Sequence, residues 1–246
     1  MSNQNAPLPG DGNGPEVAAE AKRLIETVAE KYDLDIAMES ALIGGAAIDA
    51  KGNPLPEETL AACREAHAVV LGAVGGPKWS DPNAAVRPEQ GLLKIRKELG
   101  LYANLRPVSV HPKLVDASPL RPERLEGVDM MVVRELTGGS YFGEKKEGDE
   151  FASDVCAYSR EEVERVVMHA GVIARGRRGK LTMIDKANVM ATSRLWRKVS
   201  GEIMARHYPD VQYDVLLVDA AAMFLVTEPA RFDVIVTENM FGDILT

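Results

Sequence analysis

Short apolar runs alternate with amphipathic segments along most of the chain. Runs of strand length rich in aliphatic residues predict strands at 34–39, 68–74, 102–110, 128–133, 181–184, 215–218 and 234–237. Apolar residues at helical spacing predict helices at 15–32, 56–66, 89–99, 159–175 and 191–208. The fourth helix has a local start signal, because Ser159 and Glu162 have the spacing of a capping box. Strands that alternate with helices are typical of an α/β protein with a mainly parallel sheet.

The N-terminal segment fits this pattern least well. Asn3, Asn5 and Pro7 stand where a first strand would be apolar. Proline cannot donate a ladder hydrogen bond, so we expect this strand to be weak or at a sheet edge. Residues 8–15 form a glycine-rich loop before a helix, but without the full spacing of a dinucleotide fingerprint. A turn is expected at 44–45.

Charged side chains follow several of the expected strands. Arg134 comes directly after the buried run 128–133. Ligands of open α/β sheets bind just beyond the carboxyl ends of the strands, so this guanidinium is a candidate for holding an anionic substrate. The glycine pair 138–139 can take unusual backbone angles and would let Tyr141 reach the same place. The structural alternative is a surface ion pair for Arg134 and a packed ring for Tyr141.

Two further arginines stand beside candidate binding residues. Leu92 and Arg96 lie one turn apart on an expected helix, and Leu93 is adjacent, so an apolar pair and a cation can face one cleft. Arg106 interrupts an expected strand, and a charge in a central strand needs a partner or a ligand. Together with Arg134, these guanidiniums suit a substrate with more than one carboxylate.

Composition excludes several classes of protein. The 246 residues are 46% hydrophobic, and 29 basic against 37 acidic residues give a net charge of −8 without a basic block, which argues against nucleic-acid binding. Cys63 and Cys156 are too few for a disulfide framework and lack metal-ligand spacing. Residues 1–14 lack the pattern of a signal peptide, and no apolar run has the length of a membrane span. We therefore expect a cytoplasmic protein without a nucleic-acid or membrane partner.

Six ordered blocks carry a family resemblance. They are Leu-Pro-Gly-Asp-Gly-Asn-Gly-Pro-Glu from residue 8, Asn-Leu-Arg-Pro from 104, Arg-Glu-Leu-Thr-Gly-Gly-Ser-Tyr-Phe-Gly from 134, Asp-Lys-Ala-Asn-Val from 185, Val-Asp-Ala-Ala-Ala-Met from 218 and Asn-Met-Phe-Gly-Asp from 239. Over essentially its whole length, the chain resembles the β-decarboxylating dehydrogenases of hydroxy acids, the isocitrate/isopropylmalate dehydrogenase family. The resemblance implies a two-domain α/β fold with a large, mainly parallel sheet, oxidative decarboxylation with NAD and Mg²⁺ or Mn²⁺, and a homodimer with shared active sites.

The same resemblance implies the domain limits. Residues 1–103 are expected to be the N-terminal part of the first, cofactor-side domain, and 104–246 a second domain with the dimer interface and an arm. The family continues beyond the position of Thr246 with another acidic metal ligand and a glycine-rich loop for the adenosine half of NAD. We therefore expect the first domain to be incomplete and the chain to be C-terminally truncated.

Residue roles also follow from the resemblance. It implies Tyr141 and Lys186 as catalytic residues, with Lys186 taking the hydroxyl proton and Tyr141 returning a proton to the enolate left after CO₂ departs. A lysine in water is mostly protonated at neutral pH, so its role requires neighbouring cations or desolvation. The remaining roles are substrate binding by Leu92, Leu93, Arg96, Arg106 and Arg134, cofactor binding by Gly75, Gly76, Glu89 and Asn188, and metal binding by Asp219 and Asp243. Lys186 and Asp219 are expected to come from the partner subunit.

Substrate choice rests on the helix expected at 89–99. Glu89, Leu92 and Leu93 resemble the pattern of the family members that act on (2R,3S)-3-isopropylmalate in leucine biosynthesis, and an apolar pair suits an isopropyl group. Two alternatives stay open. One is a tartrate- or malate-type decarboxylating dehydrogenase, and the other is an inactive binding or regulatory protein if the chain naturally ends here.

Overall fold

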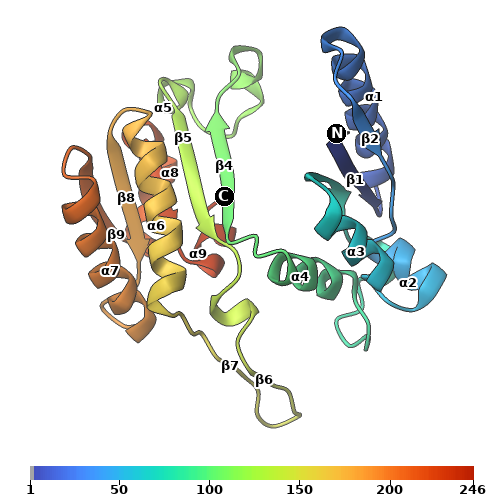
Figure 1. Ribbon diagram of the computed structural model, residues 1–246. Helices are drawn as coiled ribbons and strands as arrows, with labels where there is room; N and C mark the ends of the chain where they lie inside the picture. The colour runs from blue at the N-terminus through green and yellow to red at the C-terminus, as the bar shows by residue number, and fades with distance from the viewer. Residues whose placement is uncertain (1–2) are drawn as a thin grey trace. The chain divides into compact units, whose positions relative to one another are not determined.

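The computed structural model describes residues 3–246. It divides into two compact α/β units, one that ends at Gly100 and one that spans Leu101–Thr246 (Figure 1). Among the described helices, none is both long and apolar enough to cross a membrane.

The N-terminal unit contains a parallel three-stranded sheet in the order β2-β1-β3. Its elements are β1 (Asn3–Gly10), α1 (Gly14–Tyr32), β2 (Ile36–Met38), α2 (Gly45–Lys51), α3 (Glu57–Glu65), β3 (Ala68–Ala73), a 3-10 turn (Pro77–Trp79) and α4 (Pro88–Glu98). Aliphatic side chains of β1, α3 and α4 form its core, notably Ala6, Leu8, Leu60 and Ile95.

The expectation of a weak or edge first strand is wrong, because β1 pairs with both other strands of this sheet. Strand β2 ends at Met38, which pairs with Asn5. Pro7 comes two residues later and faces the same neighbour, so β2 has no residue left there that would need the N–H that Pro7 lacks. The carbonyl of Pro7 on that side still accepts the N–H of Ala41 at 3.0 Å. The polar residues of β1 therefore do not prevent its central position.

Of the turn expected at 44–45, Gly44 is in a turn with a φ of +75°, and Gly45 is already the first residue of helix α2. The side chain that satisfies its first N–H groups is the buried Asp11, whose carboxylate accepts the N–H groups of Gly45 and Ala46, both at 2.6 Å. A carboxylate is favourable at a helix N-terminus, where backbone N–H groups are otherwise unpaired. Asp11 also accepts the N–H of Gly75 at 3.0 Å, which ties the loop after β3 to the loop after β1.

The C-terminal unit contains a five-stranded sheet in the order β4-β5-β10-β8-β9. Its main elements are β4 (Ala103–Ser109), α5 (Pro122–Leu125), β5 (Asp129–Glu135), α6 (Arg160–Arg175), β8 (Lys180–Asp185), α7 (Ala191–His207), β9 (Gln212–Leu217), α8 (Val218–Thr227), β10 (Val234–Thr237) and α9 (Asn239–Ile244). Shorter elements are the 3-10 turns Pro112–Ala117, Gly139–Tyr141 and Pro229–Arg231, and the antiparallel pair β6 (Lys145–Lys146) and β7 (Ser153–Asp154).

Both faces of the larger sheet are covered, which explains why its strands read as continuous apolar runs. Helices α6 and α7 pack on one face, against side chains that include Val133 and Met183 (Figure 1). Helix α8 packs on the other face, against Val132 and Ile184. Strands β5, β10, β8 and β9 are parallel, as expected for this fold class.

Strand β4 differs from the expectation, because it lies at the sheet edge and runs antiparallel to β5. Arg106 is therefore not in a central strand, and its half-buried side chain needs fewer partners than a buried one. The capping box at the start of α6 is confirmed. The hydroxyl of Ser159 accepts the N–H of Glu162 at 3.2 Å, and the carboxylate of Glu162 accepts the N–H of Ser159 at 2.7 Å.

We predict that Asp11→Ala destabilises the N-terminal unit by about 3 kcal/mol, because it leaves three backbone N–H groups without their acceptor. Hydrogen exchange followed by mass spectrometry should show faster exchange in peptides from residues 3–100. The control is Asp35→Ala, which removes an exposed carboxylate of the same unit and should change stability by less than about 0.5 kcal/mol. Equal exchange in the two variants would contradict the role given to Asp11.

Candidate active site

Parallel strands end at a common edge, and the expected functional residues of the C-terminal unit follow those ends. Arg134 lies at the end of β5, with Tyr141 in the 3-10 turn that follows. Lys186 and Asn188 follow β8, Asp219 lies in the first turn of α8 after β9, and Asp243 lies in α9 after β10. This carboxyl edge of the sheet is where open α/β proteins bind ligands.

Arg134 is the centre of the first cluster, and its side chain is only 2% exposed. Its Nε and Nη2 groups donate to the side-chain oxygen of Asn239 at 3.0 and 2.8 Å. Its Nη1 group makes an ion pair with Asp243. The hydroxyl of Tyr141 donates to the other carboxylate oxygen of Asp243 at 2.9 Å, and the guanidinium lies 5.9 Å from the centre of the Tyr141 ring.

These contacts set the charge states of the cluster. Partial burial and the neighbouring carboxylate of Asp243 raise the pKa of Tyr141 above its ordinary value, so the phenol is neutral at physiological pH. Burial alone would raise the pKa of Asp243, but the Tyr141 hydroxyl and the Arg134 guanidinium lower it overall. The site therefore combines a protonated donor with a charged carboxylate.

The turn that carries Tyr141 is held in place by a buried carboxylate. Glu135 accepts the N–H and hydroxyl of Thr137 at 2.9 and 2.8 Å, and the N–H of Gly138 at 2.8 Å. Glycine is required at 138 because an added Cβ would lie 2.5 Å from the ring of Tyr158. Of the two glycines expected to take unusual backbone angles, Gly139 does so with a φ of +72°, whereas Gly138 is extended.

Arg106 lies toward the same cluster. Its guanidinium donates to the side chain of Asn104 at 2.8 Å and to the hydroxyl of Thr246 at 2.9 Å. Its charge also contributes to the lowered pKa of Asp243. Two of the three expected arginines, Arg106 and Arg134, thus act on one carboxylate.

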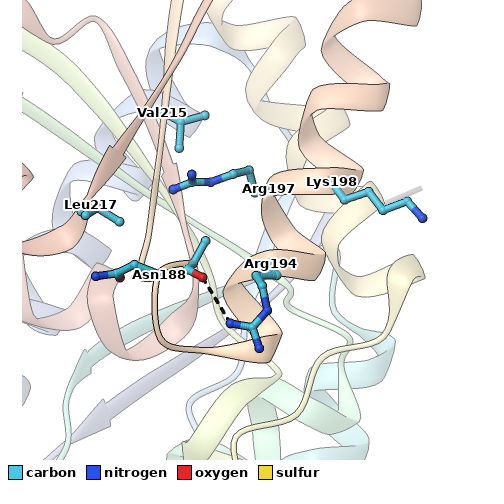
Figure 2. Close-up of a pocket in the computed structure, with 7 residues that line it drawn as sticks. Asn188, Arg194, Arg197, Lys198, Val215 and Leu217 are labelled. Atoms are coloured by element: carbon cyan, nitrogen blue, oxygen red, sulfur yellow. Dashed lines mark hydrogen bonds between the residues drawn. The ribbon is translucent and has the colours of Figure 1, made fainter.

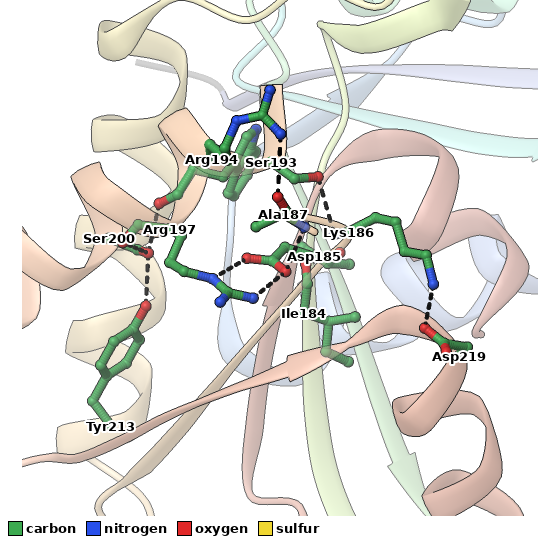
Figure 3. Close-up of polar contacts among 12 residues, drawn as sticks. Ile184, Asp185, Lys186, Ala187, Ser193, Arg194, Arg197, Ser200, Tyr213 and Asp219 are labelled. Carbon is green, nitrogen blue, oxygen red and sulfur yellow. Dashed lines mark hydrogen bonds and ion pairs between the residues drawn. The ribbon is translucent and has the colours of Figure 1, made fainter. Parts of the chain in front are cut away.

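The second cluster pairs Lys186 with Asp219. The ammonium group lies 2.6 Å from a carboxylate oxygen of Asp219, and this contact lowers the pKa of that carboxyl group (Figure 3). The preceding residue, Asp185, is buried and accepts two N–H groups of Arg197 at 2.8 and 2.7 Å. The backbone N–H of Lys186 donates to Ser193 at 3.0 Å. The strand end and helix α7 together hold the lysine in place.

Asn188 lies in an open pocket of about 670 Å³ next to this cluster. Figure 2 shows it with the cationic side chains that line the pocket, Arg194, Arg197 and Lys198. Arg194 donates to the carbonyl of Ala187 at 3.2 Å, and Arg197 is paired with Asp185 as described. The lining thus combines these cationic side chains with the apolar Val215 and Leu217.

The expected residues of the N-terminal unit surround the loop after β3. Gly75 and Gly76 follow this strand, and Gly75 has a φ of +99°. A Cβ added to Gly75 would lie 3.2 Å from the carboxylate of Glu89, so three of the four expected cofactor residues lie close together. On the same helix as Glu89, Leu92 packs against the core of the unit. Leu93 and Arg96 are half-buried.

A metal ion would need further oxygen ligands besides the two expected carboxylates, Asp219 and Asp243. Within residues 3–246, no three histidine, cysteine, aspartate or glutamate side chains gather in a way that could hold an ion. Asp219 and Asp243 are hard carboxylate ligands, and Mg²⁺ commonly uses one or two protein carboxylates together with water and substrate oxygens. The residues therefore fit Mg²⁺ or Mn²⁺, on the condition that substrate and water complete the coordination.

Sequence reasoning missed Asn239 and Asp11. Asn239 comes two residues after the strand at 234–237. The rule that ligands bind just beyond the carboxyl ends of strands, which indicated Arg134, could therefore have indicated Asn239 as well. Asp11 had no local signal, since the helix it supports begins 34 residues later.

Comparison with known proteins identifies the family. The family model described as isocitrate/isopropylmalate dehydrogenase matches residues 6–246. The 3-isopropylmalate dehydrogenase of Anaeromyxobacter dehalogenans is 59% identical over 244 residues, which cover 97% of this chain and 69% of the relative. That of Rhodopirellula baltica is 56% identical over 243 residues, covering 97% of this chain and 68% of the relative. The chain thus spans about two thirds of the length of these proteins.

Solved structures agree with this result. Isocitrate dehydrogenase from Methylococcus capsulatus superposes with a TM-score of 0.83 at 32% identity, over 100% of this chain and 69% of that protein. The TT0538 protein from Thermus thermophilus gives a TM-score of 0.84 at 29% identity, over 98% of this chain and 46% of that protein. The resemblance and the mainly parallel α/β fold expected from the sequence are both confirmed. The chain belongs to the isocitrate/isopropylmalate dehydrogenase family.

Proposed function

We propose that this protein oxidises and decarboxylates (2R,3S)-3-isopropylmalate to 4-methyl-2-oxopentanoate and CO₂, with reduction of NAD, in leucine biosynthesis. Relatives that carry the name 3-isopropylmalate dehydrogenase are 53–59% identical to it, which supports this substrate over others of the family. The observation that carries the proposal is the cluster of Arg134, Tyr141 and Asp243 at the carboxyl edge of the sheet, where an anion-binding cation, a neutral proton donor and a carboxylate are in contact.

The arginines supply the affinity for a dicarboxylate. Arg134 and Arg106 already act on the carboxylate of Asp243, so this place stabilises negative charge. A substrate carboxylate can take the same guanidinium groups. We also propose Arg96 as a substrate-binding cation. In this proposal Leu93, and to a lesser extent Leu92, contacts the isopropyl group. Leu92 contributes less because it also packs into the core.

The proton transfers are assigned to Lys186 and Tyr141. Lys186, in its neutral form, accepts the proton of the substrate hydroxyl as a hydride leaves the carbon that carries this hydroxyl. Loss of CO₂ from the resulting β-keto acid leaves an enolate, and Tyr141 protonates its carbon. The raised pKa of Tyr141 keeps this proton in place until the enolate, a strong base, forms. When bound, NAD accepts the hydride, and a divalent cation stabilises negative charge on the substrate oxygens as a Lewis acid.

The proposal also assigns the residues that bind the cofactor and the metal, and the oligomeric state. Gly75, Gly76 and Glu89 would hold NAD, with Asn188 contributed by the second subunit. Asp219 and Asp243 would ligate Mg²⁺ or Mn²⁺. We further propose a homodimer in which Lys186 and Asp219 act in the site of the partner, and a cytoplasmic location. The two unpaired cysteines support this location, because disulfides are rare in that compartment.

Substrate selectivity can be tested at Leu93. In an NADH absorbance assay with Mg²⁺, the natural full-length protein should turn over 3-isopropylmalate with a higher kcat/KM than malate, tartrate or isocitrate. Leu93→Asn should raise KM for 3-isopropylmalate about 5- to 30-fold, because a contact worth about 1–2 kcal/mol is lost.

The matched control is Leu24→Asn, which changes a leucine of α1 that is 65% exposed and should leave KM unchanged. Preference for one of the other three acids would overturn the proposed substrate. An unchanged KM in Leu93→Asn would remove Leu93 from the substrate pocket.

Sharing of sites between subunits can be tested by mixing two inactive variants. Tyr141→Phe and Lys186→Ala should each lower kcat by about 10²- to 10⁴-fold, because each removes a proton-transfer group. If each site takes Tyr141 from one subunit and Lys186 from the other, a mixed dimer has one site with both substitutions and one with neither. Co-expression should then restore about a quarter of wild-type activity. Activity that stays at the sum of the two variants would argue against shared sites.

A further inference from the structure

Asn239 joins several parts of the first cluster through hydrogen bonds. It is the first residue of α9 and is 1% exposed. Its side-chain oxygen accepts two N–H groups of Arg134, and its amide nitrogen donates to the carbonyl of Gly138 at 3.1 Å. Its backbone N–H donates to the hydroxyl of Tyr158 at 2.9 Å. One side chain thus joins β5, the turn that carries Tyr141, and α9.

These contacts restrict how Arg134 can be oriented. A guanidinium has five N–H donors, of which two go to Asn239 and one to Asp243 among the contacts of residues 3–246. Two donors remain, one on each terminal nitrogen, which is the number a carboxylate takes in a bidentate contact. The stem is enclosed as well, because a Cβ added to Gly242 would lie 2.6 Å from Cγ of Arg134.

The contact to Gly138 ties the same side chain to the proton donor. Gly138 opens the 3-10 turn Gly139–Tyr141, so the donated hydrogen bond fixes the start of the segment that places the phenol. An amide is the one group of this size that offers both an acceptor for Arg134 and a donor for a carbonyl. An aspartate would keep the acceptor and lose the donor, and an alanine would lose both.

We propose that Asn239 is a positioning residue that couples the carboxylate contact made by Arg134 to the placement of Tyr141 for protonation. Asn239 itself does not touch the substrate and acts through these two side chains. This inference rests on the proposed function, because it assigns a task to each of the two groups that Asn239 holds.

The test is a set of double-mutant cycles on the natural full-length protein, with kcat and KM for 3-isopropylmalate measured at saturating NAD and Mg²⁺. Asn239→Ala should raise KM about 10-fold and lower kcat about 10-fold. In an Arg134→Lys background its effect on KM should shrink to under about 3-fold, and in a Tyr141→Phe background its effect on kcat should shrink likewise. Contacting residues that act as a unit are non-additive in this way.

Asn239→Asp serves as a second variant of the same shape. It keeps an acceptor for Arg134 and loses the donor to Gly138, so its kcat should fall, and the fall should disappear in the Tyr141→Phe background. The matched control is Thr237→Val. Thr237 is fully buried two residues earlier and lies beside Arg134 in the sheet, but its hydroxyl donates to the carbonyl of Ile184 at 2.9 Å and not to Arg134 or Tyr141. It should lower the unfolding midpoint while changing kcat and KM by less than about 2-fold.

The outcomes separate the two claims. The positioning role would be overturned if Asn239→Ala changed kcat and KM by the same factors in the wild-type, Arg134→Lys and Tyr141→Phe backgrounds. It would also be overturned if Asn239→Ala changed kcat and KM as little as Thr237→Val does. Either result would leave the proposed function intact. A wild-type protein that neither binds 3-isopropylmalate in calorimetry nor turns it over would overturn the proposed function, and the inference with it.

Discussion

The burial of Arg134 is the constraint on which the C-terminal unit depends. A charge with 2% exposure is stable only when a counter-charge and hydrogen-bond acceptors lie beside it, because an unpaired buried charge costs several kcal/mol. Asn239 and Asp243 supply those partners from one face of α9, four residues apart. The position of α9, and with it the end of β10, is therefore set by the same guanidinium that we assign to substrate binding.

Sheet topology explains why the remaining groups gather at this edge. Strands β5, β10, β8 and β9 run parallel, so the segments after them leave the sheet on one side. Two of these segments are held by a buried carboxylate at the end of the strand before them: Glu135 of β5 accepts the N–H of Gly138, and Asp185 of β8 accepts the N–H of Ala187. Asp11 has the same function in the N-terminal unit, where it ties the loop at Gly75 to α2. Buried carboxylates that accept backbone N–H groups thus fix the path of these loops at the edge of each sheet.

The sequence predicts features that depend on neighbouring residues better than those that depend on distant ones. The capping box of Ser159 and Glu162 is a local pattern, and the structure confirms both of its hydrogen bonds. The place of Pro7 in a central strand could not be predicted, because it depends on where a neighbouring strand ends. The edge position of Arg106 likewise follows from strand order, which apolar runs do not encode. Within the site, Asn239 was missed because its task is visible only when its partners, 105 and 101 residues away in the chain, are placed beside it.

The most direct test of this account is a crystal structure of the natural full-length protein with 3-isopropylmalate and Mg²⁺ bound. The account predicts one substrate carboxylate on the two remaining N–H donors of Arg134, with Asn239 still holding the other side of the guanidinium. It also predicts Asp243 on the metal and the Tyr141 hydroxyl facing the carbon that is protonated. Substrate bound elsewhere, with Arg134 contacting only Asn239 and Asp243, would contradict the account.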